Sequence, residues 1–324
     1  MTSARSATAP SLDLPTMTFV LPGATPPAPI PHDDIVSKTS FGVCAFIDVL
    51  GFAEEVRRVS TLDDLVRTRD RINRVRNQFD FEPRDDMLLD LHSMYDKRVL
   101  AFSDSVIAYF PLRSKAMEMQ GDFDPVFSEL AGFAEAQGAC VLGNGDFVRG
   151  GVELGWWFQD GTTLVSDALV EAHGLETRAD VPVIAIGERL YEHARSHRDR
   201  QAYATEIDPV DTAFRRYEGI YKGQPTRFYY LDYIRICLDS IDALETRADV
   251  ERYKAAAPGP ARQAILDTSH RARLLEWLTC HATQIKHAHE TAPIVAQSKY
   301  VWLADYHNEM CDMHIADPSC YCRL

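Results

Sequence analysis

Two short apolar runs in this chain each contain a single aspartate, and these two aspartates limit the folds that the chain can adopt. The runs are residues 46–52, with Asp48, and residues 102–107, with Asp104. An unpaired carboxylate is costly to bury, and two that converge repel each other unless a cation lies between them. Ligands that are all oxygen favour a hard cation such as Mg²⁺ or Mn²⁺. The runs therefore predict two strands whose ends meet at a metal site of the kind that handles phosphates.

Composition and charge exclude several classes of protein. The chain has 324 residues, 46% of them hydrophobic, so it can bury one large core or two smaller ones. Its net charge of -14 argues against a general nucleic-acid binder, although a divalent cation could still bring a nucleotide to an acidic protein. We find no apolar run of about 18 residues and no secretory signal, so no membrane partner is expected. Seven irregularly spaced cysteines then indicate reduced thiols in a cytoplasmic protein.

Three regions are expected along the chain. Residues 1–37 form a proline-rich tail that should be extended or disordered, unless Phe19, Val20 and Leu21 dock it on the body. Residues 38–208 form the main domain. Residues 209–324 form a strand and helical extension that packs on the main domain, because no flexible linker precedes it.

The main domain alternates strand and helix patterns. Strands are expected at 41–49, 98–104, 105–111, 147–158 and 181–186, and helices at 62–79, 124–136 and 170–175. Leu65, Ile72 and Phe79 mark the buried face of the first helix, and Asp124 is the expected N-cap of the second. The order β-α-β-β-α-β is that of the split βαβ, or ferredoxin-like, motif, so the predicted fold class is α+β.

The extension reads differently. Residues 229–238 are expected to form a strand that runs into a helix, and residues 250–254, 261–285 and 292–310 are expected to be helical. His281, His287 and His289 lie on a predicted helical segment, but without the i, i+4 spacing that a shared ligand face needs.

In a ferredoxin-like sheet the first strand lies beside the central hairpin, so Asp48 and Asp104 should reach one point at the rim. Each motif alone has an ordinary explanation, because Asp48 could be a cap and Ser103-Asp104-Ser105 could be a plain turn. Together they could hold two metal ions that organise a triphosphate. Gly51 would let the backbone approach the phosphates, and the helix opening near residue 53 would point N–H groups toward the anion.

Three motifs resemble class III nucleotidyl cyclases, in family order across about residues 40–190. Residues 46–52 (FIDVLGF) are similar to the first metal motif, residues 102–105 (FSDS) to the second, and residues 149–155 (RGGVELG) to an Arg-x-Gly-Ile-x-x-Gly strand. The chain resembles most closely the pyrimidine nucleotide cyclases of the Pycsar anti-phage systems, which share these motifs, residues 168–172 (ALVEA) with Leu175 and Glu176, and residues 299–308 near the end.

The departures from the family concern the half of the site that reads the base. Adenylate cyclases carry a lysine where this chain has Leu100, and an asparagine and an arginine where the best alignment places Val170 and Gly174. Either the substrate base differs or catalysis has been lost. An apolar wall at Leu100, narrowed by Leu50 or Phe102, favours a pyrimidine over a purine.

The resemblance implies an enzyme that converts UTP to 3',5'-cyclic UMP and pyrophosphate. The cyclic UMP would be an antiviral second messenger that a cyclic-nucleotide-binding effector reads. It implies two Mn²⁺ or Mg²⁺ ions at Asp48, Asp104 and the Val49 carbonyl, and a homodimer. The nucleotide would lie along the following residues: Phe46, Leu50, Gly51, Phe52, Arg98 and Phe102.

Other readings stay open. The product could be cyclic CMP from CTP, or the chain could be an inactive nucleotide-binding relative that only signals. A diguanylate cyclase shares the sheet topology but needs a Gly-Gly-Asp/Glu-Glu-Phe hairpin where this turn reads FSDS. Arg98 and Arg149 could contact the triphosphate or make surface ion pairs. Four residues could reach the site but are better explained as packing residues: Lys299, Tyr300, Trp302 and Tyr306. A zinc site could be imagined at Cys311, His314, Cys320 and Cys322, but reduced, partly exposed thiols explain these cysteines better.

Overall fold

The computed structural model describes residues 32–80 and 93–324, and the chain divides into two compact units, residues 1–37 and residues 38–324. In the first unit the described part is a short helix, α1 (His32–Ser37). The expectation of extended or disordered backbone is therefore wrong for residues 32–37. The rest of the tail, including Phe19, Val20 and Leu21, lies outside the described residues.

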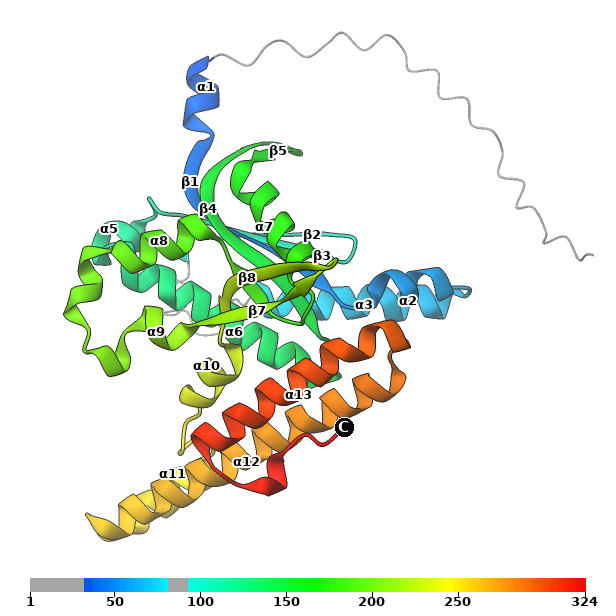
Figure 1. Ribbon diagram of the computed structural model, residues 1–324. Helices are drawn as coiled ribbons and strands as arrows, with labels where there is room; N and C mark the ends of the chain where they lie inside the picture. Colours follow the sequence, from blue (N-terminus) through cyan, green and yellow to red (C-terminus); the bar gives the residue numbers. More distant parts are fainter. Residues whose placement is uncertain (1–31, 81–92) are drawn as a thin grey trace, which may run out of the picture. The chain divides into compact units, whose positions relative to one another are not determined.

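The second unit is built on one eight-stranded sheet (Figure 1). Its strands are β1 (Thr39–Val49), β2 (Arg98–Phe102), β3 (Ser105–Pro111), β4 (Val148–Asp160), β5 (Thr163–Ser166), β6 (Ile184–Ile186), β7 (Phe214–Tyr221) and β8 (Gln224–Leu231). The order across the sheet is β2-β3-β1-β4-β6-β8-β7, with β5 paired to β4. β1 lies between β3 and β4 and is antiparallel to both, as the split βαβ motif requires. The predicted α+β fold class is confirmed.

Helices cover both faces of the sheet. On one face, alternate residues of β1 (Val43, Ala45, Ile47 and Val49) are buried in a core with side chains of α3 (Leu62–Phe79) and α6 (Phe123–Asn144). On the other face, α7 (Asp167–Arg178) packs across β4 and β1. β4 has glycine where α7 crosses it, and a Cβ at Gly151 would lie 2.2 Å from the Ala172 carbonyl oxygen. The glycine thus lets the helix backbone rest directly on the strand.

The helix predicted at residues 62–79 has those bounds, because Thr61 and Asp64 close a capping box at its start. Its expected buried face is partly wrong. Phe79 is buried, but Leu65 is 54% exposed, and Val75 and Thr68 are buried instead. Three apolar residues at i, i+7 spacing do not define which face of the helix is buried.

The helix predicted at 124–136 is longer than expected, since α6 runs from Phe123 to Asn144. Its N-cap is Asp122 and not Asp124, and the Asp122 side chain makes no capping hydrogen bond. Apolar residues continue past residue 136 through Cys140 and Val141, and the helix ends only at Gly145, whose φ of +69° suits glycine.

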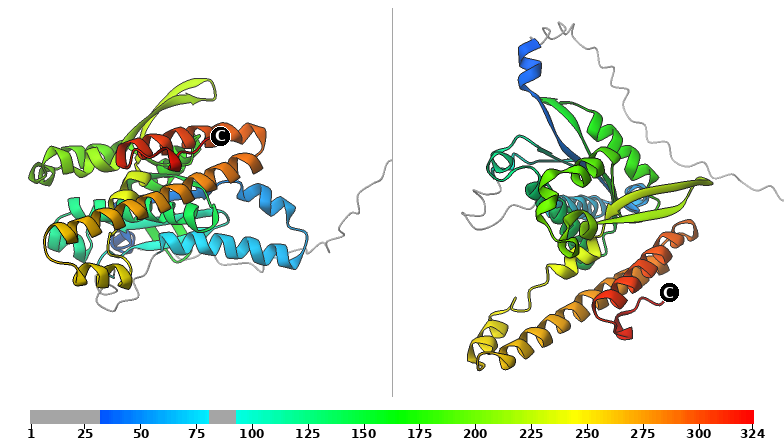
Figure 2. Two further views of the ribbon diagram at one scale, coloured as in Figure 1. Left: turned by 90° about the horizontal axis from the view of Figure 1, so that it is seen from below. Right: turned by 60° about the vertical axis from the view of Figure 1, so that its left-hand side comes forward.

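The remaining helices of the second unit include α2 (Phe52–Arg58), α5 (Lys115–Gln120), α8 (Glu188–Ser196), α9 (Pro209–Ala213), α10 (Tyr233–Asp239), α11 (Arg247–Ala255), α12 (Pro260–Thr291) and α13 (Ile294–His314), with short 3₁₀ turns at Arg198–Ala202, Thr205–Ile207 and Pro318–Cys320. The extension begins with the β7–β8 hairpin, which continues the sheet, and ends with the paired helices α12 and α13 (Figure 2). The sequence predicted the end of β8 and the helices α10 to α13, but neither α9 nor β7. None of the helices among the described residues is both long and apolar enough to cross a membrane.

Candidate active site

The strand register brings the two predicted aspartates together at one rim of the sheet. Asp48 lies opposite Ser105 of β3 and Arg149 of β4, and the Val49 N–H donates to the Asp104 carbonyl over 3.3 Å. Asp104 itself sits in the β2–β3 turn, where Ser103 has a φ of +57°. The sequence prediction that Asp48 and Asp104 are neighbours therefore agrees with the register, and their side chains are partly buried.

Asp48 lies in an environment with an excess of negative charge. Burial raises its pKa to about 6, Glu176 and Asp104 add to the rise, and Arg149 opposes it. Arg149 Nε is 3.4 Å from Asp48 Oδ2, and its Nη2 is 2.5 Å from Glu176 Oε1. Asp48 and Glu176 thus share one guanidinium, and Asp104 adds a third negative charge nearby.

This donor set fits hard divalent cations. The carboxylates of Asp48 and Asp104 and the backbone carbonyl of Val49 are oxygen donors, and the surplus negative charge around Asp48 is what a cation would neutralise. Mg²⁺ or Mn²⁺ would therefore be held by Asp48, Asp104 and Val49.

The loop after Asp48 is held in a fixed conformation. Gly51 has a φ of +80°, and the Leu50 N–H donates to the Phe147 carbonyl over 2.9 Å. Phe52 starts α2 with its side chain buried in the core, so only its backbone borders the loop. α2 has seven residues, so its N-terminus offers a smaller dipole than the sequence suggested.

Arg71 of α3 ties this loop to its surroundings. Its guanidinium pairs with Glu55 of α2, donates to Asp146 Oδ1 over 2.6 Å, and donates to the Leu50 carbonyl over 3.4 Å. The sequence placed Arg71 on an outer face of its helix, whereas it is mostly buried. Its role could not be recognised from spacing alone, because neighbouring arginines at similar spacing point to solvent.

A second row of side chains lies on the same sheet face as Asp48. Phe46 faces Ile107, and Ile107 faces Leu100, two residues along each strand from the Asp48 row. The Phe46 ring meets the edge of His173 on α7 at 4.9 Å. Phe102, at the end of β2 and on the Asp48 row, is 77% exposed. An apolar strip therefore runs from Phe46 beside α7 through Ile107 to Leu100 on the edge strand β2.

The structure does not bring Arg98 to the aspartates. Arg98 faces Tyr109 at the end of β2 that is far from the turn, and it is exposed and pairs with Asp96. Two charged residues near the aspartates were not predicted as site residues. They are Arg71, described above, and Glu176, which the sequence analysis names only as part of the family resemblance. A glutamate beside Leu175 on the buried face of a helix was the available signal.

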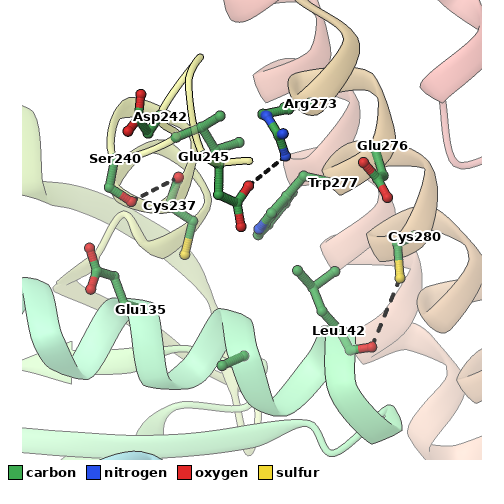
Figure 3. Close-up of a pocket in the computed structure, with 12 residues that line it drawn as sticks. Glu135, Leu142, Cys237, Ser240, Asp242, Glu245, Arg273, Glu276, Trp277 and Cys280 are labelled. Carbon is green, nitrogen blue, oxygen red and sulfur yellow. Dashed lines mark hydrogen bonds and ion pairs between the residues drawn. The ribbon is translucent and has the colours of Figure 1, made fainter. Parts of the chain in front are cut away.

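Two cavities accompany this architecture. One, of about 670 Å³, borders Leu50 and Gly51 and also receives Lys299 and Tyr300 from α13. Lys299 pairs with Asp180, whereas Trp302 and Tyr306 pack in the core, as expected for packing residues. A cavity of about 720 Å³ lies between α6, the α10–α11 segment and α12, and Figure 3 shows Arg273 paired with Glu245 beside Trp277. None of the predicted site residues lines that second cavity.

The cysteines near the C-terminus do not converge with His314 on a metal-binding geometry in the described part of the chain. All seven cysteines are free thiols, as predicted, and Cys311, Cys320 and Cys322 are buried rather than partly exposed.

Comparison with known proteins gave structural matches only. No protein-family model matches the chain, and no curated protein matches it. The chain is similar in structure to the adenylyl cyclase CyaB from P. aeruginosa, with 15% identity and a TM-score of 0.40 over 60% of this chain and 94% of that one. It is similar to the monomeric guanylyl cyclase domain of the RhoGC fusion protein from the fungus Blastocladiella emersonii, with 14% identity and a TM-score of 0.39 over 60% and 96%. It is also similar to a class III adenylyl cyclase-like ATP-binding protein from Pseudomonas aeruginosa, with 10% identity and a TM-score of 0.38 over 86% and 72%.

Proposed function

We propose that this protein is a nucleotide cyclase that makes a 3',5'-cyclic pyrimidine monophosphate, cyclic UMP from UTP. The single observation that carries the proposal is the pairing of Asp48 and Asp104 at one rim of a split βαβ sheet, where the pKa of Asp48 is raised to about 6. Two carboxylates that repel each other in a half-buried site are an arrangement that a bound cation stabilises.

The reaction would break the bond between the α- and β-phosphates and form one between the ribose 3'-oxygen and the α-phosphorus, releasing pyrophosphate. Divalent ions held by Asp48, Asp104 and Val49 would neutralise the triphosphate and lower the pKa of the 3'-hydroxyl. The contact between Arg149 Nε and Asp48 Oδ2 is already long, at 3.4 Å. A cation bound to Asp48 would replace this contact, and the Arg149 guanidinium would then contact a phosphate oxygen. The Leu50–Gly51 loop, fixed by Arg71, would lie along the phosphates.

The choice of a pyrimidine rests on the apolar strip beside α7. Leu100 offers no hydrogen bond to a base edge, and Ile107 and Phe46 on the same row and Phe102 two residues along β2 add apolar bulk. A wall of this kind rejects by size rather than by hydrogen bonding, which favours the smaller base. Cyclic CMP from CTP is the nearest alternative, since no residue of the strip distinguishes a uracil carbonyl from a cytosine amine. As a second messenger, the product would be read by a cyclic-nucleotide-binding effector in antiviral defence.

One observation favours an inactive relative as a second candidate. Val170 and Gly174 stand on the outer face of α7, where the family resemblance expects an asparagine and an arginine. Gly174 has no side chain, and Val170 is 68% exposed and apolar. In that case the protein would bind nucleotide and signal without turnover.

Incubation with each of the four ribonucleoside triphosphates, separately and with Mn²⁺, tests the proposal by chromatography and mass spectrometry of the products. We expect cyclic UMP from the wild type and none from Asp104→Asn. Cyclic AMP or cyclic GMP as the main product would contradict the pyrimidine assignment, and cyclic CMP would contradict only the uridine part. Binding of a triphosphate with no cyclic product under any condition would establish the inactive alternative.

A further inference from the structure

A second cluster of metal-ligating side chains lies away from the aspartates. His193 lies in the last turn of α8, His197 is the C-cap residue of that helix, and both rings face Asp122, the N-cap residue of α6. His193 Nε2 is 3.2 Å from Asp122 Oδ2, and His197 Nε2 is 2.9 Å from Asp122 Oδ1. One ligand atom from each of the three residues lies within 4.8 Å of the other two.

Hydrogen bonding within the protein satisfies only part of this cluster, since the His197 Nε2 atom is hydrogen-bonded to Asp122 Oδ1. The Asp122 carboxylate is the N-cap of α6 but accepts no hydrogen bond from the helix backbone. His193 Nε2 is buried and has no hydrogen-bond partner of acceptable geometry, although a carboxylate oxygen lies 3.2 Å away. Buried polar atoms without a partner are uncommon in folded proteins and call for an explanation. A cation between the three side chains would use the lone pair of each of them.

The type of donor selects the cation. Two imidazole nitrogens and one carboxylate oxygen suit a borderline metal such as zinc, whereas Mg²⁺ and Ca²⁺ prefer oxygen alone. A histidine in the last turn of α8 and a second one at its C-cap, completed by a carboxylate at the start of α6, bring three ligands to one point. We propose that Asp122, His193 and His197 form a zinc site.

Neighbouring residues support the ligands from outside. Asp199 Oδ2 lies 3.8 Å from His197 Nδ1, so it can accept the Nδ1 proton once Nε2 binds the metal, and the Asp199 N–H then gives up its present bond to Nδ1. The Phe123 ring stacks on His197 at 5.1 Å, and Tyr203 packs against Phe123. The His197 ring is therefore held in position before any metal binds.

The location indicates a structural role. Figure 1 shows α8 and the β2–β3 turn at opposite ends of the sheet, so this cluster is remote from Asp104. Zinc here would join the start of α6 to the end of α8 and leave a fourth position for water, because the three ligands are each partly exposed. It would fix the position of α6, whose other end contributes Asp146 to the Arg71 contacts.

Zinc content and thermal stability test the proposal on a chain freed of any polyhistidine tag. We expect about one zinc per chain by mass spectrometry of the metal, a melting temperature that falls on chelation, and recovery with Zn²⁺ but not with Mg²⁺. Because Asp48 and Asp104 could also bind added zinc, the titration is made in an Asp104→Asn chain.

Three variants, Asp122→Asn, His193→Gln and His197→Gln, should each weaken zinc affinity at least about tenfold and remove the stabilisation. His289→Gln, a partly exposed histidine on α12, is the matched control and should behave as the wild type. Co²⁺ gives a further readout, since a low-coordinate site with imidazole ligands produces visible absorption that the three variants should lose. A wild type without zinc that gains no stability from it, or site variants that bind zinc as tightly as the control, would overturn the assignment.

Discussion

At the scale of single residues, the charged form of Asp48 lowers the stability of the metal-free protein and offers a carboxylate to a cation. Its carboxylate is desolvated and faces Glu176 and Asp104, and Arg149 offsets only part of this repulsion. The folded chain without metal therefore favours the protonated form of Asp48 more than the unfolded chain does. A cation would reverse that preference, which links metal binding to stability.

Replacing Asp48 by Asn should abolish turnover and stabilise the metal-free protein. The pKa of Asp48 rises from 3.8 to about 6 on folding, so the carboxyl group costs stability as pH rises through this window. Urea unfolding in the presence of a chelator should show little difference from the wild type near pH 4. Near pH 7.5 the variant should be more stable by up to about 2 kcal/mol.

Asp104→Asn serves as the companion variant and should also lose turnover. Asp104 contributes less than Glu176 to the raised pKa of Asp48. The gain in stability from Asp104→Asn should therefore be smaller than the gain from Asp48→Asn. Near-normal activity of either variant in Mn²⁺ would contradict the metal assignment.

At the scale of secondary-structure elements, Arg71 connects three segments around the loop that follows Asp48. It bonds α3 to Glu55 on α2, to Asp146 beyond α6, and to the Leu50 carbonyl. Asp146 is almost fully buried, so the loss of Arg71 would leave an uncompensated carboxylate in the interior.

We expect Arg71→Met to lower the free energy of unfolding by about 3 kcal/mol and to raise KM for the triphosphate. Arg69→Met is the matched control on the same helix, because Arg69 is exposed and pairs with its sequence neighbour Asp70. The control should change stability by less than about 0.5 kcal/mol. Equal effects of the two substitutions in urea unfolding would show that Arg71 has no special role.

The α12–α13 pair contains two buried histidines that should make it sensitive to acid. His281 Nδ1 lies 3.0 Å from His307 Nδ1, the Tyr233 hydroxyl bonds the other nitrogen of His281, and the Cys320 carbonyl faces His307. Burial lowers the pKa of both histidines below the ordinary value of 6.5, so the unfolded chain takes up more protons as pH falls. Their contribution to stability is present above pH 6.5 and lost below it.

The urea midpoint should therefore fall between pH 7.5 and pH 5.5, and a His281→Gln, His307→Gln double variant should show a weaker dependence on pH. His289→Gln is again the control and should keep the wild-type slope. If the double variant is less stable at both pH values but has an unchanged slope, the two histidines do not cause the acid sensitivity.

Sequence reading succeeded for elements with a clear period or a clear cap and failed where neither was present. Residues 62–79 carry a capping box, and residues 105–111 form a continuous apolar run, so both elements had the expected bounds. β7 was missed because arginines and a glutamate interrupt its apolar pattern, and it is stable only because β8 pairs with it. The strand predicted at 181–186 shortens to three residues, since Ile184 is the first to pair with β4.

At the scale of the whole molecule, the described residues cover only part of the sheet face that carries the candidate site. α7 covers β4 and β1, but Leu100, Ile107 and the exposed Phe102 continue that face over β3 and β2. A single chain thus offers the predicted metal-binding residues but, in its described part, few groups that could enclose a nucleotide.

We predict a homodimer that buries more than about 1,000 Å² in total on this face. Light scattering at micromolar concentration should give twice the mass of the chain, and turnover per chain should rise with protein concentration. Phe102→Glu should weaken the dimer, whereas Ile207→Glu, an exposed apolar residue outside this face, should not. A monomer whose turnover is independent of concentration would contradict the prediction.

The candidate site as a whole could be predicted only in part. The adjacency of Asp48 and Asp104 followed from the order of strands, because that order fixes which strands pair. The places of Arg71 and Glu176 did not follow, since spacing along a helix does not reveal which charged side chain faces the interior. Arg98 was expected beside the nucleotide, and the register separates it from Asp104 by the length of β2.

The direct contact between α7 and β4 has a consequence for protein engineering. At Gly151 the helix backbone rests on the strand with no side chain between them, so substitutions there would displace the whole helix. On the opposite side, a Cβ at Gly174 would meet nothing within 4 Å, and Val170 is largely exposed. A combinatorial library at positions 170 and 174 can therefore vary the outer face of α7 while the buried interior of the protein stays unchanged.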